Sequence, residues 1–305
     1  MKFGRWALSA LIASACLCGT SLAQDQLSIG FANPLPAYPV WAEADKCFND
    51  AIAAAGIKGQ TSGPTGLQVD NQFVLDRISQ YIATGSNALI VVPIDGPMYE
   101  PLMKEAKEKG MWVVTLNTGD TTSTQDVQLG TDYANQGALV AENLAKREGE
   151  QNVIIVGNQP TGVHRVFVDG FLKGAEAYPN VKLVVEAYDQ GDPAQTVDVV
   201  SRALTAHPEA NVVLSWEGNI VSGITTAIKE KDLVGKVVAV VNDITPEVVA
   251  GIKEGTIYGT SKQNFCGMAS GAVDAIVKLS KGESVPKNID TGITFVTSEN
   301  LEAEQ

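Results

Sequence analysis

Residues 70–95 read as an amphipathic helix, a short buried strand and a polar turn, and this unit limits the folds open to the chain. Apolar side chains recur on one helical stripe over 74–82, and Gly85 then suits a left-handed cap. The run 88–92 is uniformly apolar, as expected of a strand buried on both faces of a parallel sheet. Asp95 follows in a turn that we expect it to cap, at the strand end where open α/β sheets bind ligands.

The same unit recurs along the chain in two series, which predicts two lobes. Strands are expected at 27–32, 58–61, 88–92, 112–116, 152–156, 181–187, 211–215, 237–241 and 292–296. Helices are expected between them at 40–55, 69–83, 101–109, 163–178, 194–206, 220–229 and 246–253, and the tail after Ser298 is expected to fray. Such alternation indicates parallel sheets with helices on both faces, and 305 residues are too many for one core of usual size.

The first 23 residues have the pattern of an export signal. Lys2 and Arg5 precede an uncharged apolar stretch that ends at Ala23 after a small residue, as in secretory signal peptides. The apolar part is short for a membrane span. A lipoprotein signal at Cys16 is the weaker alternative, because alanine stands where that signal prefers leucine. We expect cleavage after Ala23 and export.

The exported chain is strongly acidic, which excludes several partners. Removal of Lys2 and Arg5 leaves 20 of the 22 basic residues against all 35 acidic ones. Such a balance disfavours binding to nucleic acid or to anionic lipid. It suits a freely diffusing protein, which we expect to be a monomer.

Motifs for catalysis and for cofactor binding are scarce. No phosphate-cradling G-x-x-x-x-G-K-[ST] is present, and no G-x-G-x-x-G follows the first expected strand. His164 and His207 are the only histidines, which disfavours a histidine-based triad or metal site. We therefore expect no catalytic residue, no metal and no cofactor. A secreted enzyme is the least favoured class of function.

Polar and aromatic side chains follow five of the expected strands, where a sugar can be bound. Carboxylates and amides accept paired hydrogen bonds from neighbouring hydroxyls, and aromatic rings cover the C–H face of a sugar. The residues at these positions are Tyr38, Trp41, Asn117, Arg165, Glu217, Asn242 and Asp243. Their common position predicts a site for a sugar or polyol at the sheet edges.

These segments resemble the periplasmic sugar-binding proteins of the ribose-binding type, the soluble receptors of bacterial ABC importers. The likeness covers nearly the whole exported chain and includes the segment 70–95, the opening Tyr38-Pro-Val-Trp41, the strand 113–117 and the Gly130-Thr-Asp132 crossing. It implies a type I periplasmic binding fold, with two doubly wound parallel-sheet lobes joined by three hinge crossings. The implied lobes are 24–130 plus 264–291 and 131–263 plus 292–305.

The resemblance also implies roles for single residues. The implied ligand-binding residues are Tyr38, Trp41 as the stacking ring, Asn117, Arg165, Glu217, Asn242, Asp243 and Gln263, and Asp132 is implied at a hinge. Asn117 stands where the family has aspartate, and Glu217 where it usually has asparagine or aspartate. These differences predict a different ligand on the same scaffold.

Two cysteines remain in the exported chain, Cys47 and Cys266. Export favours a disulfide, and the implied fold returns the late helix that begins near Cys266 to the first lobe, beside the helix of Cys47. Two separate buried thiols are the alternative.

The function that follows is a receptor that closes on a sugar or polyol and delivers it to an ABC permease in the inner membrane. A sensor of the same fold is the second hypothesis. It would signal to a chemoreceptor or a membrane kinase, for example on a ligand like autoinducer-2.

Overall fold

A computed structural model describes residues 1, 26–66, 69–94, 96–117, 124–190 and 192–304. The predicted cleavage after Ala23 and the role of Asp95 lie outside the described residues. None of the described helices is both long and apolar enough to cross a membrane.

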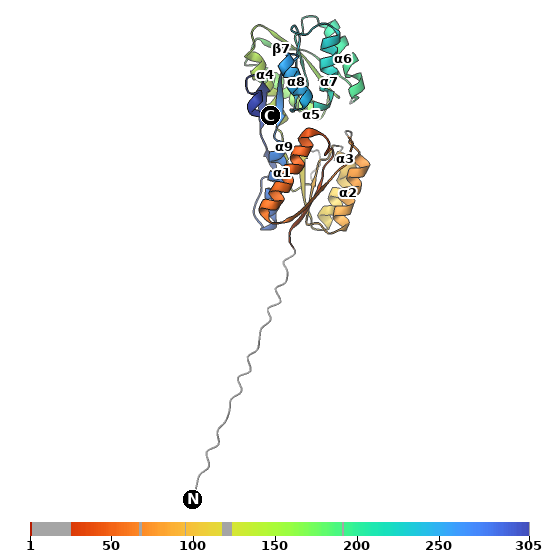
Figure 1. Ribbon diagram of the computed structural model, residues 1–305, viewed down its shortest axis with the longest axis vertical. Coiled ribbons are helices and arrows are strands. Elements are labelled where there is room, and N and C mark those ends of the chain that lie inside the picture. Colours follow the sequence, from red (N-terminus) through yellow and green to blue (C-terminus); the bar gives the residue numbers. More distant parts are fainter. Residues whose placement is uncertain (2–25, 67–68, 95, 118–123, 191, 305) are drawn as a thin grey trace.

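Two six-stranded sheets form the centres of two lobes, which lie one above the other in Figure 1. The first has the order β11-β5-β4-β3-β1-β2, and all its strands are parallel. Its strands are β1 Ser28–Ala32, β2 Lys58–Ser62, β3 Ala88–Val91, β4 Trp112–Asn117, β5 Val127–Gly130 and β11 Asn288–Asp290. This sheet and its helices are called the first lobe.

The second sheet repeats this topology in the order β12-β10-β9-β8-β6-β7. Its strands are β6 Gln151–Gly157, β7 Val181–Tyr188, β8 Val212–Leu214, β9 Val238–Asn242, β10 Ile257–Gln263 and β12 Ile293–Thr297. Strand β12 is antiparallel to β10, whereas the other strand pairs are parallel. This sheet and its helices are called the second lobe, and the predicted two-lobe α/β fold is confirmed.

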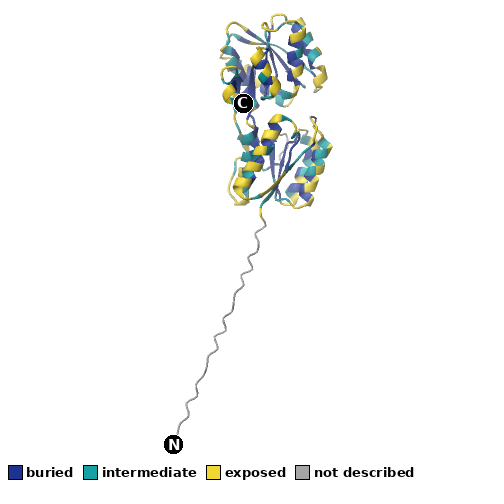
Figure 2. Ribbon diagram, in the orientation of Figure 1, coloured by how far each residue is buried: buried dark blue, intermediate teal, exposed yellow. Residues whose placement is uncertain are grey.

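Helices cover both faces of each sheet, so the central strands are buried while the outer helix faces are exposed (Figure 2). In the first lobe, α1 Pro39–Ala55 and α9 Phe265–Ser280 share one core, and α2 Asn71–Ala83 and α3 Gly96–Glu108 share the other. In the second lobe, α4 Tyr133–Ala145 and α5 Val163–Ala175 lie opposite α6 Thr196–Ala206, α7 Val221–Glu230 and α8 Pro246–Glu254. The chain ends in α10 Leu301–Glu304.

Two expectations for local structure were wrong. Helix α3 begins at Gly96 and carries Pro101 inside it, whereas Pro101 was expected to start the helix. The tail after Ser298 does not fray. Leu301 is buried in the core of the second lobe, and the Lys262 ammonium lies 3.1 Å from the Glu304 carboxylate, so α10 is held at both ends.

The chain passes between the sheets three times, at 131–132, at 264 and at 291–292. Asp132 accepts a hydrogen bond from the Asn135 N–H and so caps α4. The Thr291 N–H donates to the Gly130 carbonyl over 2.9 Å, and the Asn264 side-chain amide donates to the Thr291 carbonyl over 3.0 Å. The three crossings are thus hydrogen-bonded to one another.

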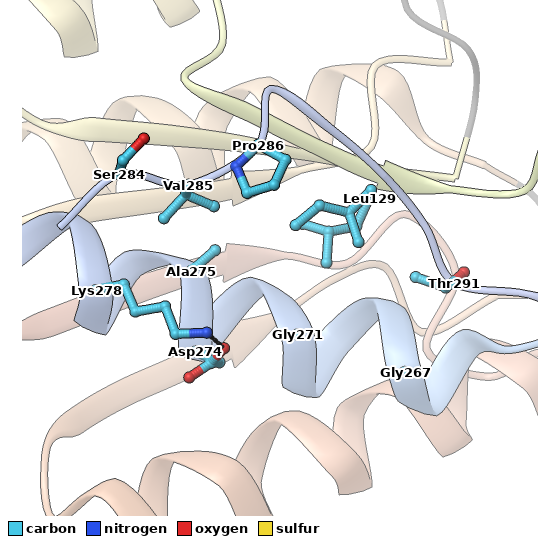
Figure 3. Close-up of a pocket in the computed structure, with 11 residues that line it drawn as sticks. Leu129, Gly267, Gly271, Asp274, Ala275, Lys278, Ser284, Val285, Pro286 and Thr291 are labelled. Atoms are coloured by element: carbon cyan, nitrogen blue, oxygen red, sulfur yellow. Dashed lines mark ion pairs between the residues drawn. The ribbon is translucent and has the colours of Figure 1, made fainter.

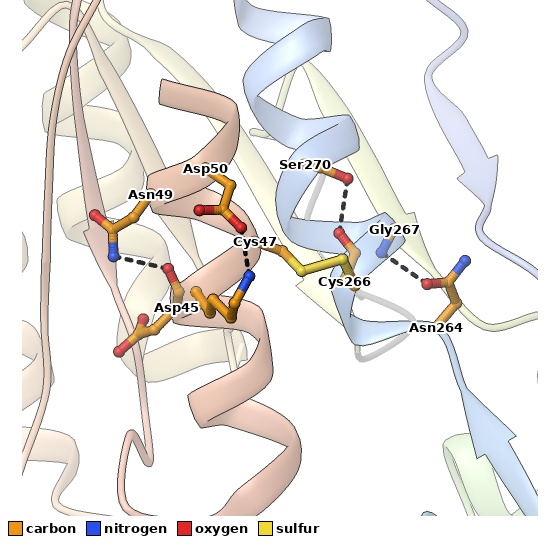
Figure 4. The surroundings of a disulfide bond; sticks show 9 residues. Asp45, Cys47, Asn49, Asp50, Asn264, Cys266, Gly267 and Ser270 are labelled. Carbon is orange, nitrogen blue, oxygen red and sulfur yellow. Dashed lines mark hydrogen bonds and ion pairs between the residues drawn. A yellow bond between two sulfur atoms is a disulfide. The ribbon is translucent and has the colours of Figure 1, made fainter. Parts of the chain in front are cut away.

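Cys47 and Cys266 form a disulfide with a Cα–Cα distance of 5.2 Å, which confirms the predicted bridge. Helices α1 and α9 lie side by side there (Figure 4), although the two cysteines are 219 residues apart in the sequence. The bridge therefore joins the beginning of the first lobe to the segment that returns to it after the second lobe.

Candidate functional site

Six polar and aromatic side chains meet where strands of the two lobes end, and they are called the strand-tip cluster. Its members are Tyr38, Asn117, Tyr133, Trp216, Asp243 and Gln263. The local sequence explains this position, because each buried strand must end in a turn that carries polar side chains, and parallel strands end at one edge of a sheet.

Asp243 directly follows β9 and is 6% exposed. Its Oδ1 accepts a hydrogen bond from the Gln263 side-chain amide over 3.1 Å, and its carbonyl accepts one from the Thr260 hydroxyl over 2.6 Å. Burial raises the pKa of Asp243 to about 7, although the hydrogen bond from Gln263 opposes this change. The carboxyl group is thus fixed in direction by its protein partners.

Gln263 connects this carboxylate to the first crossing. Its Oε1 accepts a hydrogen bond from the Thr131 hydroxyl over 2.8 Å, while its Nε2 donates to Asp243. Beside them, the Tyr133 hydroxyl donates to Asn117 Oδ1 over 3.1 Å. Asn117 belongs to the first lobe and Tyr133 to the second, so this hydrogen bond spans the lobes.

Tyr38 reaches across from the first lobe. Its hydroxyl oxygen lies 3.4 Å from the position that a Cβ atom would take on Gly218, and the Asp243 Oδ2 lies 3.2 Å from the same position. Burial raises the pKa of Tyr38 to about 12, and the negative charges of Asp243 and Glu247 add to the effect. The hydroxyl therefore stays protonated and able to donate to an oxygen between the lobes.

Glu217 follows β8 and faces the end of β6. Its Oε1 accepts a hydrogen bond from the Asn158 N–H over 2.7 Å. Burial and, to a smaller degree, the charge of Asp189 raise the pKa of Glu217 to about 7 against the effect of that hydrogen bond. Asn242 is also buried near the cluster, where its Oδ1 accepts from the Gln136 amide over 2.7 Å.

The side chains of two predicted ligand residues contact residues outside this cluster. The Arg165 guanidinium forms ion pairs with Asp169 at 2.9 Å and with Glu186 at 3.1 Å. Trp41 is only 7% exposed and packs edge-on against Phe265 in the core of the first lobe, with ring centroids 4.9 Å apart. Their ligand roles stay predictions that these contacts do not support.

Tyr133, His164 and Trp216 were not among the residues predicted for the site. Tyr133 begins a helix that was not expected. Trp216 directly precedes Glu217 at a strand tip, which was a usable signal. His164 is fully buried and contacts Trp216, a partner 52 residues away that no sequence pattern indicates.

A cavity of about 420 Å³ lies elsewhere, on the first lobe between α9 and β11 (Figure 3). Apolar side chains dominate its lining, including Leu129, Val285 and Ile289, and the Asp274–Lys278 ion pair lies beside it. Few polar groups converge there, so it does not suit a sugar. Within the described ranges, no group of three or more His, Cys, Asp or Glu side chains is placed to hold a metal ion.

Comparison with known proteins identifies the family of this fold. The model of the family described as "Periplasmic binding protein domain" matches residues 29–284. A D-ribose/D-allose-binding protein of Pseudomonas aeruginosa is 25% identical over 259 residues, which cover 81% of this chain and 78% of that protein. A putative rhizopine-binding protein of Rhizobium meliloti is 25% identical over 74% of this chain and 76% of its own length.

Solved structures share the fold. An ABC transporter solute-binding protein from Burkholderia graminis, in complex with D-arabinose, is 27% identical with a TM-score of 0.77, over 90% of this chain and 96% of that one. A glucose-galactose-binding protein from Geobacillus stearothermophilus is 21% identical with a TM-score of 0.81, over 91% and 99% of the two chains.

The fold and the strand-tip cluster define a two-lobed binding protein. The chain belongs to the periplasmic binding protein domain family, as the match over residues 29–284 shows. The members of this family are binding proteins and not enzymes.

Proposed function

We propose that this protein is the periplasmic receptor of an ABC importer and binds a sugar or polyol between its lobes. The single observation that carries the proposal is the chain of hydrogen bonds from Thr131 through Gln263 to Asp243, which links a hinge crossing to a buried carboxylate. A ligand hydroxyl group bound by Asp243 acts directly on the residues that set the angle between the lobes. Binding then shifts the population toward the closed form.

The charges around the cluster favour a ligand without negative charge. No Lys, Arg or His of the described chain lies in ion-pair contact with Asp243 or Glu217. The Arg165 guanidinium is already bound by two carboxylates. Neutral hydroxyl groups can donate to these carboxyls, whereas a sugar acid or sugar phosphate would be repelled. The relatives named for ribose and allose, and the structure with arabinose, support a neutral sugar.

The remaining predictions complete the proposal. The chain would be exported through the signal peptide 1–23, act as a monomer in the periplasm and deliver its ligand to a membrane permease. Its lobes would be 24–130 plus 264–291 and 131–263 plus 292–305, with Asp132 at a hinge. Ligand contacts would come from Tyr38, Asn117, Glu217, Asn242, Asp243 and Gln263. No observation favours the sensor role or a catalytic activity.

A thermal-shift screen of neutral sugars and polyols, followed by calorimetry, tests the proposal. A ligand at 100 times its Kd should add about 2.7 kcal/mol to the free energy of unfolding. The Asp243→Ala variant should lose this shift. Asp198→Ala, which removes an exposed carboxylate of a surface ion pair, should keep it. Scattering should show compaction with the ligand, and no response to any compound of the panel would refute the proposal.

A further inference from the structure

His164 is a fully buried histidine with a defined hydrogen-bond partner at each ring nitrogen. Its Nδ1 lies 3.2 Å from Trp216 Nε1, and its Nε2 lies 3.1 Å from Glu186 Oε2. An indole N–H only donates, so Nδ1 must accept and carries no proton. A carboxylate only accepts, so Nε2 carries the proton. The two partners together select the neutral Nε2–H form of the ring.

The far side of this histidine is held by strand β7. Glu186 accepts hydrogen bonds from the Tyr188 hydroxyl over 2.7 Å and from the Arg165 guanidinium over 3.1 Å. On β6, a Cβ atom on Gly157 would lie 2.0 Å from His164 Nδ1, so only a glycine there leaves space for the ring. The imidazole is therefore fixed in place and direction by β6 and β7.

Trp216 connects His164 to the strand-tip cluster. It lies at the tip of β8, is half-buried, and meets Tyr133 edge-on with ring centroids 5.6 Å apart. Tyr133 in turn donates its hydrogen bond to Asn117 of the first lobe. Trp41, the ring predicted to stack on the sugar, is enclosed in the core. Trp216 is thus the tryptophan that the fold places among the polar groups.

We propose that His164 is a positioning residue, which as a neutral imidazole fixes Trp216 as the aromatic wall of the ligand site. Protonation of His164 would then release Trp216 and weaken ligand binding. This inference rests on the proposed function, because it needs a ligand that packs against the indole ring. It adds an acid-sensitive component to the binding of a neutral sugar.

The expected direction follows from the groups around the ring. A proton on Nδ1 would face the indole N–H, so two donors would oppose each other. Burial lowers the pKa of His164, and the positive charge of Arg165 adds to this effect, while Glu186 opposes it by hydrogen bond and charge. Tyr188 packs edge-on against the imidazole and is protonated at neutral pH, because burial and Glu186 raise its pKa to about 12. His164 is therefore neutral at pH 7, and affinity falls only in acid.

Nitrogen NMR of histidine-labelled protein tests the hydrogen bonds without any ligand. The chain has only one other histidine, the half-buried His207, which serves as an internal reference. We expect an unprotonated Nδ1 and a protonated Nε2 for His164 at pH 7. A proton on Nδ1, or a charged ring at that pH, would overturn the inference.

Two substitutions of His164 distinguish the contribution of Nδ1 to ligand affinity from that of Nε2. Asparagine places an acceptor near the position of Nδ1, so His164→Asn should keep the affinity within about threefold, whereas His164→Gln should lose about tenfold or more. In a Trp216→Phe background, which has no N–H donor, His164→Gln should cost little further affinity. His207→Gln is the matched control and should change nothing.

The pH dependence completes the test, because Asp243 and Glu217 also titrate near neutrality. The wild type should lose more affinity than His164→Asn as the pH falls below the pKa of His164. Melting curves must show that each variant is folded, and Gly157→Ala, which displaces the ring without changing it, should reproduce the loss of His164→Gln. Binding that is indifferent to His164→Gln would overturn this inference alone. A wild type that binds no sugar or polyol would overturn the proposed function as well.

Discussion

Asn117 and Asp243 hold equivalent positions in the two lobes, and both have a left-handed backbone, with φ of 69° and 64°. Asn117 ends β4, which lies between β3 and β5, and Asp243 follows β9, which lies between β8 and β10. Asparagine and aspartate accept this conformation better than other residues with a side chain. The same turn therefore directs one polar side chain from each lobe toward the other.

Asn117→Gly and Asn117→Ala should distinguish the effect of the backbone conformation on stability from the effect of the side chain on ligand affinity. Both variants lose the hydrogen bond from Tyr133, so both should lose ligand affinity to a similar degree. Only alanine must also adopt a positive φ, which costs about 1 kcal/mol. Urea unfolding should show the alanine variant to be less stable than the glycine variant by about this amount. Equal stability of the two would mean that the turn relaxes.

Asp243→Asn should change how stability depends on pH. The folded-state pKa of about 7 lies above the ordinary aspartate value of 3.8, so between these values the folded protein holds a proton that the unfolded chain has released. Wild-type stability should therefore fall as the pH rises from about 4 to about 7. Asparagine cannot ionise, so at pH 8 the variant should be more stable than the wild type, by on the order of 2 kcal/mol.

Urea titrations from about pH 5 to about pH 8 measure this difference. Asp198→Asn changes an exposed carboxylate, and its stability should depend on pH in the same way as that of the wild type. If the stability of Asp243→Asn also depended on pH in this way, the carboxyl group would be solvated in the unliganded protein, and its burial would belong only to the closed form.

The Cys47–Cys266 bridge should stabilise the first lobe. It closes a loop that contains most of the second lobe, from α4 to β10, so the double variant Cys47→Ser/Cys266→Ser should lose about 2–4 kcal/mol of unfolding free energy. Calorimetry without reductant measures the loss, and the wild type with reductant should show the same change. An unaltered melting curve would show that the packing of α1 on α9 holds the lobe without the bridge.

The sequence predicted the layered fold because buried parallel strands are uniformly apolar and their helices are amphipathic. Segment 127–145 was missed for two physical reasons. Strand β5 has four residues, too few for a periodic signal, and α4 buries Tyr133 and Gln136 together with apolar side chains. Helix α4 also packs on α5 at a glycine, since a Cβ on Gly170 would lie 2.1 Å from the Ala134 carbonyl oxygen. Such a contact leaves no apolar pattern in the sequence.

The contacts of the site residues were also only partly predictable from the sequence. Strand ends indicated where Asp243 and Glu217 lie, because polar turns follow buried strands at one sheet edge. Their partners depend on segments far apart in sequence. Arg165 is bound by Glu186, which the register of β6 and β7 brings beside it, and Trp41 is buried by Phe265 of the returning helix α9. Neither contact has a local signature, so the sequence indicated the positions of these residues and not their partners.

Gln263→Leu should uncouple the ligand site from the hinge. Leucine fills the space of the glutamine but leaves the buried Thr131 hydroxyl without its acceptor, which costs about 1–3 kcal/mol. Asp243 loses the side-chain amide of Gln263 but keeps the hydrogen bond to the Gln263 backbone. Stability should fall in urea, and calorimetry should show at least a tenfold loss of sugar affinity. Thr294→Ala, at an exposed residue of the neighbouring strand β12, is the control and should change neither. The contradicting outcome is that Gln263→Leu loses stability and still binds sugar like the wild type. The Gln263 amide would then stabilise the crossings without coupling them to the ligand site. Coupling requires that the protein lose affinity for sugar when this hydrogen bond is removed.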